Sequence, residues 1–376
     1  MKKGIRDICF VATAFTASRL FVAFGVFLGR KFFSFAPAFH NNNLEAAWWE
    51  SLMRWDAGHY VNIAVNGYNY LPDGKMYNVG FFPLYPLLIK VIVNLLGVSP
   101  AIVGLVLSNV SFLLALLLLR RYTEKYHPDA DPDLVILLMA FHPFGVFFSS
   151  VYNESLFLLL CVSAFAMFRA GKMIASACAL FLMGATRLPG LFVLATMGSY
   201  HLFSRVVRLN KKALDVNARE LQRLVLWALL SASGFLLFVS YQQFTFGYWD
   251  AFIRVQAAFE RHPIGSFSAL FHEMDLDPYH IMNILPAAAV LVLSIVFLFL
   301  KNYRLYSLWG FLVVLVPLST GSFGGMTRYS MVFFPLVIFG SSLLKKIPLL
   351  RDITIMACSA ALTIFAALFV RSYFLG

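Results

Sequence analysis

The chain has 376 residues, of which 60% are hydrophobic and only 13% are charged, and its mean hydropathy is +0.77. Soluble domains average roughly 45–50% apolar and about 25% charged residues, so this few ions could not cover a soluble surface of this size. The composition excludes soluble, disordered, collagen-like and disulfide-rich proteins. It indicates an all-α polytopic membrane protein.

The net charge is +12, from 30 Lys and Arg against 18 Asp and Glu. Basic residues accumulate in the cytoplasmic loops of membrane proteins, and no basic helix or aromatic RNA-binding pattern accompanies them here, so we expect no nucleic-acid partner. The four cysteines lie in apolar runs without CxxC spacing and are predicted to be buried small hydrophobes. The apolar run that follows Met1-Lys2-Lys3 is long enough to stay as a first helix rather than a cleaved signal.

A helix needs about 20 apolar residues to cross the hydrocarbon core of a bilayer. Eleven runs approach this length, no internal repeat is visible, and we predict one membrane domain over 1–376. The candidate spans are 8–29, 101–119, 134–151, 153–169, 173–187, 188–204, 224–243, 283–300, 305–319, 329–344 and 353–371.

A twelfth apolar run, 81–97, is shorter and carries Lys90 near its middle. The distribution of Lys and Arg places the N-terminus and the loop 205–223 in the cytoplasm. The remaining basic clusters are also cytoplasmic only if 81–97 does not fully cross, so we predict that it is re-entrant or lies in the interface. The loops outside, which we predict to form the active-site face, are then 30–80, 244–282 and 320–328.

The first outer loop contains the sequence Arg54-Trp55-Asp56-Ala57-Gly58-His59-Tyr60. Aromatic and apolar neighbours at a membrane surface desolvate a carboxylate, which makes Asp56 a candidate general base. The alternative is that Asp56 is the N-cap of a short helix, Ala57–Val65, because Asp is a favoured capping residue. Both interpretations are open at the level of the sequence.

Three more charged residues lie beside breaks at the outer ends of predicted spans. Glu154, in Tyr152-Asn153-Glu154-Ser155, is costly in an apolar helix unless a partner reaches it, although a first-turn Glu also complements the helix dipole. Arg187 precedes Leu188-Pro189-Gly190, and Arg328-Tyr329 follows the glycine-rich segment 321–325. Arg187 and Arg328 suit recognition of a phosphate, although an Arg at this depth could also snorkel to the surface.

Two acidic clusters could in principle hold a metal. Asp129-Ala130-Asp131 has DxD spacing, but the neighbouring prolines favour a solvated turn that caps a helix from Leu134. The outer-loop residues His272, Glu273, Asp275, Asp277 and His280 match no metal-site spacing and are predicted to be a polar loop. No nucleotide-binding motif and no GxSxG elbow is present, so we expect neither a metal nor another cofactor.

The order Arg54-Trp55-Asp56, His59-Tyr60, Ile63-Ala64, Gly67-Tyr68 and Phe81-Phe82-Pro83-Leu84-Tyr85-Pro86 resembles the PIG-V family, the second mannosyltransferase of GPI-anchor assembly, and its prokaryotic relatives. The elements Tyr152-Asn153-Glu154-Ser155-Leu156-Phe157, Thr186-Arg187 with Gly190, and Arg328-Tyr329 with Phe334-Pro335 are similar to later family motifs. The likeness extends over roughly 50–340. Asn153 and Leu188-Pro189 depart from the eukaryotic pattern.

The resemblance implies a GT-C membrane glycosyltransferase whose donor is a sugar on a polyprenyl phosphate, with Asp56 at the position of the family's loop aspartate. We therefore predict an inverting transfer of a hexose, mannose by the resemblance, to a lipid- or glycan-linked acceptor on the extracytoplasmic face. Asp56 would accept the proton of the attacking hydroxyl, and Arg187 and Arg328 would stabilise the departing phosphate. The predicted sugar and acceptor pocket comprises Arg54, Trp55, His59, Tyr60, Tyr152, Asn153, Glu154 and Tyr329.

The expected location is the cytoplasmic membrane of a bacterium or archaeon, or the endoplasmic reticulum membrane in a eukaryote. Two other functions are compatible with the sequence. A flippase or transporter of lipid-linked sugars would need polar residues through the full depth of the membrane, and the apolar runs offer few. A non-catalytic subunit of a glycosylation complex would tolerate loss of Asp56.

Overall fold

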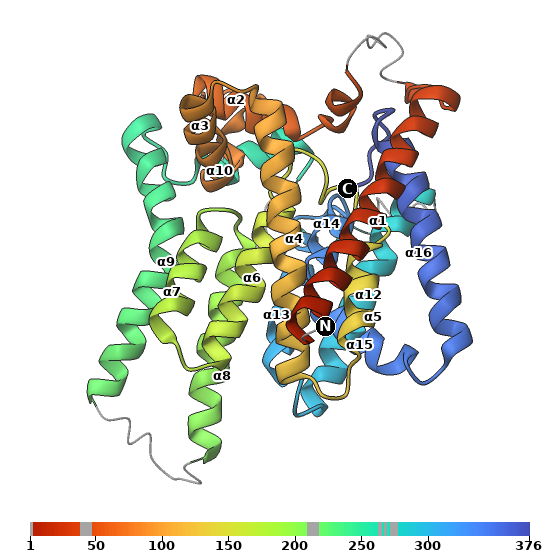
Figure 1. Ribbon diagram of the computed structural model, residues 1–376. Coiled ribbons are helices and arrows are strands. Elements are labelled where there is room, and N and C mark those ends of the chain that lie inside the picture. The colour runs from red at the N-terminus through yellow and green to blue at the C-terminus, as the bar shows by residue number, and fades with distance from the viewer. Residues whose placement is uncertain are drawn as a thin grey trace.

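The computed structural model describes residues 3–37, 47–208, 218–261, 265–266, 268, 270 and 277–376, and within these residues it contains helices and no strand (Figure 1). The predicted all-α class is confirmed. The α-helices are α1 (Lys3–Phe32), α2 (Ala57–Asn66), α3 (Leu84–Leu96), α4 (Pro100–Tyr126), α5 (Pro132–Ala140), α6 (Glu154–Arg169), α7 (Met173–Gly184), α8 (Pro189–Arg208), α9 (Ala218–Phe246), α10 (Ala251–Arg254), α12 (Pro278–Phe299), α13 (Arg304–Leu318), α14 (Met326–Met331), α15 (Pro335–Leu344) and α16 (Pro348–Phe369). Short 3-10 helices are η2 (Trp48–Leu52), η3 (Asn78–Gly80) and η4 (Val255–Phe259).

Five helices are long and apolar enough to cross a membrane: α1, α4, the Leu221–Phe246 part of α9, α12 and α16. Shorter apolar helices pack between them, among them α7, α13 and α15. The chain is therefore an integral membrane protein, as predicted. The number of eleven spans remains a prediction.

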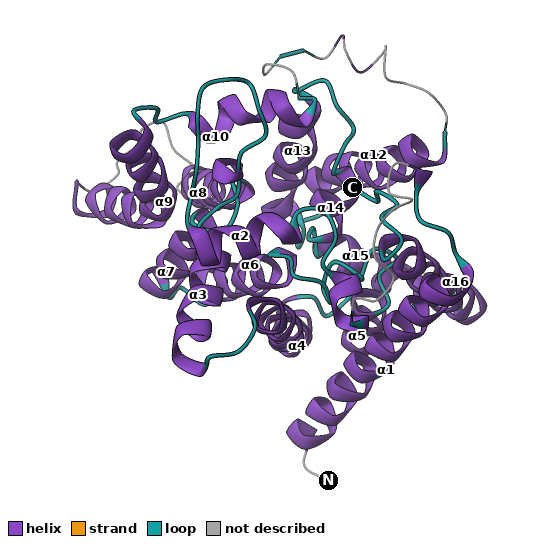
Figure 2. Cartoon of the chain, turned by 90° about the horizontal axis from the view of Figure 1, so that it is seen from above, coloured by secondary structure: helices purple, strands orange, loops and turns teal. Residues whose placement is uncertain are grey.

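Helix α3 is the short apolar run that was predicted not to cross. Its 13 residues, at about 1.5 Å per residue, give roughly 20 Å, which is less than the hydrocarbon thickness of about 30 Å. Figures 1 and 2 show α3 beside α2, at the end of the bundle away from the N-terminus, and Lys90 on this helix is exposed. This placement agrees with an interfacial helix.

The predicted span 134–151 is helical only in its first part, which corrects the sequence analysis. Helix α5 ends at Ala140, and 141–151 continues as turns because Pro143 disfavours a helical residue before it. Non-helical backbone at membrane depth is tolerated only where protein surrounds it, and the turns from Val146 to Val151 are buried. Arg19 of α1 bonds this region, with Nη1 2.6 Å from Ser149 Oγ and Nη2 3.3 Å from the carbonyl of Ala140.

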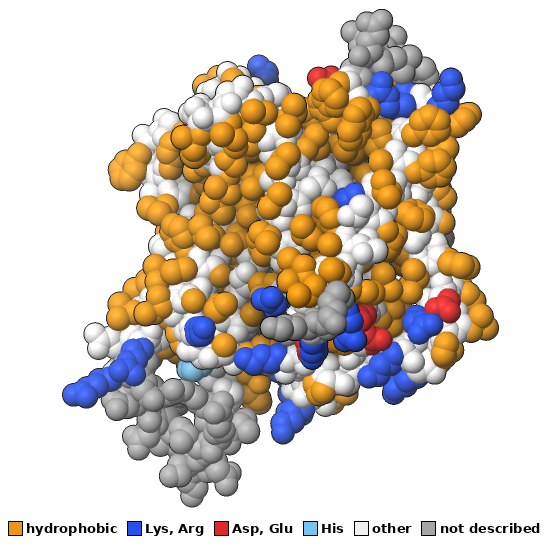
Figure 3. Space-filling model, in the orientation of Figure 1, with side chains coloured by type: hydrophobic (Ala, Val, Ile, Leu, Met, Phe, Trp, Pro, Cys, Tyr) orange, Lys and Arg blue, Asp and Glu red, His pale blue; other side chains and the backbone are white. Residues whose placement is uncertain are grey.

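Lys and Arg gather at the end of the molecule that holds the N-terminus, on the face that Figure 3 shows. Arg120 is buried at this end, where its guanidinium lies 2.9 Å from Asp7 and 2.8 Å from Asp133. This charge distribution is what the positive-inside rule predicts for the cytoplasmic side.

The DxD residues are each occupied by contacts within the protein. The Asp131 side chain caps α5 by accepting hydrogen bonds from the backbone N–H groups of Asp133 and Leu134. Asp129 accepts a bond of 2.7 Å from the Tyr303 hydroxyl. The capping interpretation of this turn is confirmed.

Helices α1 and α16 approach closely because glycines lie between them. A Cβ added to Gly25 would lie 2.4 Å from the carbonyl oxygen of Thr363, and one added to Gly29 would lie 2.5 Å from that of Ala367. Both distances are shorter than any van der Waals contact, so either substitution must separate the two helices.

We expect Gly25→Val to destabilise the protein by about 1–3 kcal/mol, the usual cost of overpacking. Thermal unfolding in detergent measures the effect. Gly4→Ala on the same helix is the control, because a Cβ there meets nothing within 4 Å. Equal stability of the two variants would contradict the close approach of α1 and α16.

Orientation can be tested with single cysteines in a cysteine-free background. The positions Asn42 and Asn217 suggested by the loops lie outside the described residues, so we choose the exposed Lys75 and Lys346. Lys75→Cys should react with an impermeant thiol reagent in intact cells, whereas Lys346→Cys should react only after the membrane is opened. The opposite pattern would place α2 and α3 on the cytoplasmic side.

Candidate active site

Four charged side chains from distant parts of the chain meet at the α2 end of the bundle. Asp56 immediately precedes α2, Glu154 begins α6, Arg187 connects α7 to α8, and Arg328 lies in α14. In the sequence, these four residues belong to separate motifs. The structure brings them together in one cluster.

Glu154 is at the centre of this cluster, and its side chain is 0% exposed. Its Oε1 atom accepts hydrogen bonds from Arg187 Nη1 at 2.8 Å and from Arg328 Nε at 2.7 Å. Its Oε2 atom is buried and has no hydrogen-bond partner among the described residues. A carboxylate this deeply buried is stable only when it is paired, so the two arginines and Glu154 depend on one another.

Arg328 joins the two carboxylates of the cluster. Its Nη1 atom donates to Asp56 Oδ2 at 2.5 Å, while its Nε and Nη2 atoms lie 2.7 Å from Glu154 Oε1. The guanidinium also lies over the Tyr152 ring, 4.8 Å from its centroid. Because Arg328 is buried and held by these contacts, the snorkelling interpretation is wrong for this residue.

Asp56 does not act as a helix cap. It occupies the position before α2, but its side chain makes no capping hydrogen bond, and its carboxylate instead binds Arg328. Its backbone N–H donates to the Tyr152 hydroxyl at 3.3 Å, which fixes the start of α2 against the turn before α6. With 23% of its side chain exposed, Asp56 is the most accessible of the four charged residues.

Trp55 adopts a left-handed backbone conformation, with φ of 56°. This region costs energy for a bulky side chain and is found where surrounding contacts over-determine the fold, often at functional sites. The Trp55 ring packs edge-on against Phe374, with 5.0 Å between centroids. The strained turn directs the chain into Asp56, the next residue.

His59 and Tyr60 line the first turn of α2. The His59 ring stacks on Phe81 at 4.5 Å and 15°. Burial lowers the pKa of His59 below its ordinary value, and the nearby Asp56 charge opposes this shift only in part. His59 is therefore neutral at pH 7, and Tyr60 is buried beside it against Phe81 and Tyr152.

Arg54 and Asn153, both predicted to line the pocket, form supporting contacts. The Arg54 Nε atom donates to the carbonyl of Val370 at 3.2 Å, away from the charged cluster. Burial, together with the charges of Arg371 and Arg30, lowers the pKa of Arg54. The Asn153 amide donates to the carbonyl of Thr186 at 2.9 Å, which ties the start of α6 to the residue before Arg187.

Arg261 also belongs to the site, and the sequence analysis missed it. Arg261 and Arg187 both contact the ring of Tyr329, with their guanidinium carbons 5.9 Å and 5.3 Å from its centroid. The Arg261 Nη2 atom donates to the carbonyl of Gly324 at 2.9 Å. The sequence signal for this residue is an Arg two positions before a proline, in Arg261-His262-Pro263, which is the same pattern as in Arg187-Leu188-Pro189.

The predicted polar loop 272–280 is only partly described. Asp277 caps α12 by accepting from the backbone N–H of His280 at 2.8 Å, while His272, Glu273 and Asp275 lie outside the described residues. Among the residues that the structure describes, no group of three His, Cys, Asp or Glu could hold a metal ion. The absence of a metal requirement remains a prediction.

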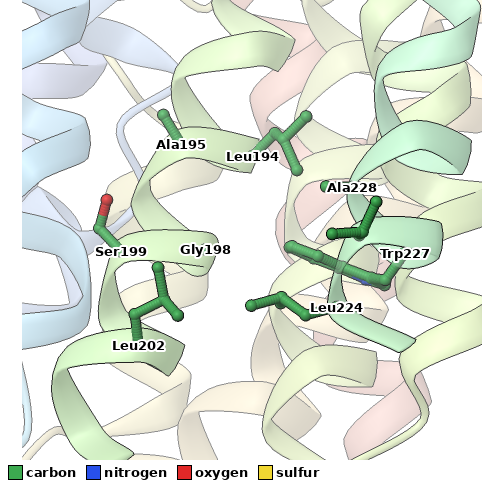
Figure 4. A pocket seen from close by; sticks show the side chains of 9 residues that line it. Leu194, Ala195, Gly198, Ser199, Leu202, Leu224, Trp227 and Ala228 are labelled. Carbon is green, nitrogen blue, oxygen red and sulfur yellow. The ribbon is translucent and has the colours of Figure 1, made fainter. Parts of the chain in front are cut away.

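An apolar cavity of about 380 Å³ lies between α8 and α9, separate from the charged cluster (Figure 4). It contains no titratable side chain, so it does not contribute to the chemistry of the site. Its lining residues are Leu194, Ala195, Gly198, Ser199, Leu202, Leu224, Val225, Trp227 and Ala228.

Comparison with protein families gives a match to the family described as Mannosyltransferase (PIG-V) over residues 6–263. The chain belongs to the mannosyltransferase (PIG-V) family. This confirms the resemblance that the outer-loop motifs indicated. The matched region contains Asp56, Glu154, Arg187 and Arg261, whereas Arg328 lies beyond it.

A characterised relative of this PIG-V family member is the GPI alpha-1,6-mannosyltransferase 2 of Rattus norvegicus. The two sequences are 31% identical over 166 residues, which are 42% of this chain and 33% of the rat protein. The match thus spans about a third of the length of the relative.

Three solved structures are similar at low sequence identity. ArnT from Cupriavidus metallidurans bound to undecaprenyl phosphate has a TM-score of 0.49 and 13% identity, covering 98% of this chain and 76% of ArnT. The Archaeoglobus fulgidus oligosaccharyltransferase, in complex with zinc and sulfate, has a TM-score of 0.45 and 12% identity, with coverages of 96% and 53%. The S. cerevisiae protein O-mannosyltransferase Pmt1–Pmt2 complex bound to the sugar donor has a TM-score of 0.43 and 12% identity, with coverages of 64% and 34%.

The central role of Glu154 predicts a large stability loss in Glu154→Gln. Removing its charge leaves the buried Arg328 and the partly buried Arg187 against the single carboxylate of Asp56, and breaking a buried ion pair costs about 3–5 kcal/mol. The matched control is Asp250→Asn, which weakens a solvent-exposed pair with Arg254, 2.7 Å apart, whose loss should change stability little. Thermal unfolding compares the two variants, and equal small losses would show that Glu154 does not hold the cluster together.

Proposed function

We propose that the protein is an inverting glycosyltransferase that moves mannose from a polyprenyl-phosphate donor to a lipid- or glycan-linked acceptor on the extracytoplasmic face. The observation that carries the proposal is the carboxylate of Asp56, partly exposed and held by the buried Arg328. Membership of the mannosyltransferase (PIG-V) family supports the reaction type and the sugar. The distribution of Lys and Arg supports the placement of the site on the extracytoplasmic face.

Asp56 would act as the general base. The acceptor hydroxyl gives its proton to the Asp56 carboxylate while its oxygen forms a bond to the anomeric carbon of the donor sugar. The bond between that carbon and the phosphate oxygen breaks on the opposite face, and its electron pair leaves with the polyprenyl phosphate. A single displacement of this kind inverts the configuration at the anomeric carbon.

The arginines would serve this step in two ways. Arg328 holds the Asp56 carboxylate in position through the hydrogen bond from its Nη1 atom to Asp56 Oδ2. We propose that Arg187 and Arg328 stabilise the negative charge that develops on the departing phosphate. Arg328 would do so with the N–H groups that do not bind Asp56 or Glu154. Charge stabilisation by arginines requires neither a metal nor another cofactor.

The aromatic residues around Asp56 suit the sugar rings of donor and acceptor. Trp55 directly precedes Asp56 in the chain, its ring packs on that of Phe374, and Phe374 is 42% exposed. His59 follows Asp56 by three residues, and the Tyr152 hydroxyl accepts the hydrogen bond of the Asp56 backbone N–H. A neutral His59 can donate or accept a hydrogen bond. We propose that these side chains, with Tyr60 and Tyr329, shape the sugar pocket.

The Asp56→Asn variant tests this function. Asn keeps the size of Asp but cannot take up the proton, so the rate of mannose transfer should fall by roughly 10²-fold or more. Transfer is measured with a synthetic polyprenyl-phosphate mannose and membrane-extracted acceptors, per amount of folded protein, because the bond to Arg328 is also altered. Asp73→Asn, an exposed aspartate of the same outer loop, should transfer at the wild-type rate. Undiminished transfer by folded Asp56→Asn would remove Asp56 from the mechanism.

A further inference from the structure

The four charged residues of the cluster balance one another. Asp56 and Glu154 carry two negative charges, and Arg187 and Arg328 carry two positive charges. Arg261 adds a third positive charge. Within the described part of the chain its hydrogen bond is to the Gly324 carbonyl, and no carboxylate lies within ion-pair distance of it. Among the described residues, these five side chains therefore carry one positive charge in excess.

Strained backbone conformations lie next to Arg261 in the structure. Glu260, directly before it, has a φ of 58°, a left-handed conformation that non-glycine residues rarely adopt. Gly325 has a φ of 85°, and a Cβ there would lie 3.4 Å from Arg261 Nη2. Trp55 and Glu260 are thus two strained residues, and each directly precedes a charged residue of the site.

Two guanidinium groups share one aromatic ring beside Glu154. Arg187 and Arg261 lie 5.3 Å and 5.9 Å from the Tyr329 centroid, and only Arg187 has a carboxylate partner. Cations over one ring gain from its quadrupole but repel each other. An anion bound between them would relieve the repulsion, and a phosphate matches the fork of an Arg guanidinium.

We propose that Arg261 is the anchor that binds the donor phosphate, in addition to Arg187 and Arg328, which stabilise the charge that develops on that phosphate during the transfer. The inference rests on the proposed glycosyl transfer and adds to it the residue that carries the charge of the lipid phosphate. The donor is a phosphodiester with one negative charge, which the single excess positive charge of the site neutralises.

The charges of the site and its ligand also balance after the reaction. Asp56 has then gained a proton and lost its charge, so the site has an excess of two positive charges. The polyprenyl phosphate has become a monoester with a charge near −2, as for phosphoserine at neutral pH. The total is near zero in both states only if Arg261 is included.

The test measures phosphate binding separately from sugar transfer. Purified full-length protein in detergent is titrated with undecaprenyl phosphate, and binding is followed by tryptophan fluorescence. Arg261→Gln should weaken binding by roughly tenfold to a hundredfold, the scale of a lost charge-assisted hydrogen bond. Its KM for the donor should rise by a similar factor, with the acceptor KM unchanged. Wild-type affinity in Arg261→Gln would overturn the proposal.

Two further variants make the result specific. Arg254→Gln, a nearby arginine already paired with Asp250, should bind undecaprenyl phosphate like the wild type. Arg261→Lys keeps the charge without the fork and should give an intermediate affinity, which supplies a test if Arg261→Gln does not fold. Equal weakening by Arg254→Gln would show an unspecific effect of surface charge and overturn the assignment.

The source of the phosphate is distinguished by competition. Phosphatidylglycerol should not displace undecaprenyl phosphate at equal concentration, and displacement would indicate a general site for anionic lipid headgroups instead. Inorganic phosphate should compete weakly. Wild-type protein that binds undecaprenyl phosphate through Arg261 but transfers no sugar would contradict the proposed function and leave the anion site intact, so the two failures are separable.

Discussion

The buried carboxylate of Glu154 is the constraint on which the site depends. With no exposure to water, its charge would cost several kcal/mol if it were unpaired, and Arg187 and Arg328 remove that cost. Three segments must therefore meet: the start of α6, the α7–α8 connection, and α14. Once Arg328 is fixed in this way, its remaining Nη1 atom reaches Asp56 and sets the position of the proposed base.

The need to pair Glu154 with the two arginines also explains the irregular backbone of the molecule. The turns between α5 and α6 bring Glu154 to the α2 end of the bundle, and Arg19 satisfies backbone groups that a continuous helix would have paired. Strained residues at 55 and 260 place Asp56 and Arg261. Among the described residues, the result is a cluster with one excess positive charge, as the proposed binding of a singly charged phosphodiester requires.

Much of the fold followed from the sequence, because a bilayer imposes length and polarity on each element. Apolar runs located most of the helices, although several ends differ from the structure by five to seven residues. The predicted span 329–344 is wrong as a single helix, because a break at 332–334 before Pro335 divides it into α14 and α15. The short helix at Ala57 appeared where it was expected. The Lys and Arg distribution indicated that α3 does not cross, and its length agrees. The prediction of one helix over 134–151 was wrong because hydropathy does not show where a helix ends. The helix stops at Ala140, and the turns that follow are tolerated because they are buried inside the protein.

The sequence alone also determined which residue types could act: an outer-loop aspartate, a glutamate at a helix start, and arginines beside chain breaks. Only the tertiary structure decided how they combine. Local patterns could not distinguish Asp56 as a cap from Asp56 as a partner of Arg328, because the two residues are 272 positions apart. They also omitted Arg261. Ion pairing acts through space at a few ångströms, so the charge balance of the site becomes visible only when the chain is folded.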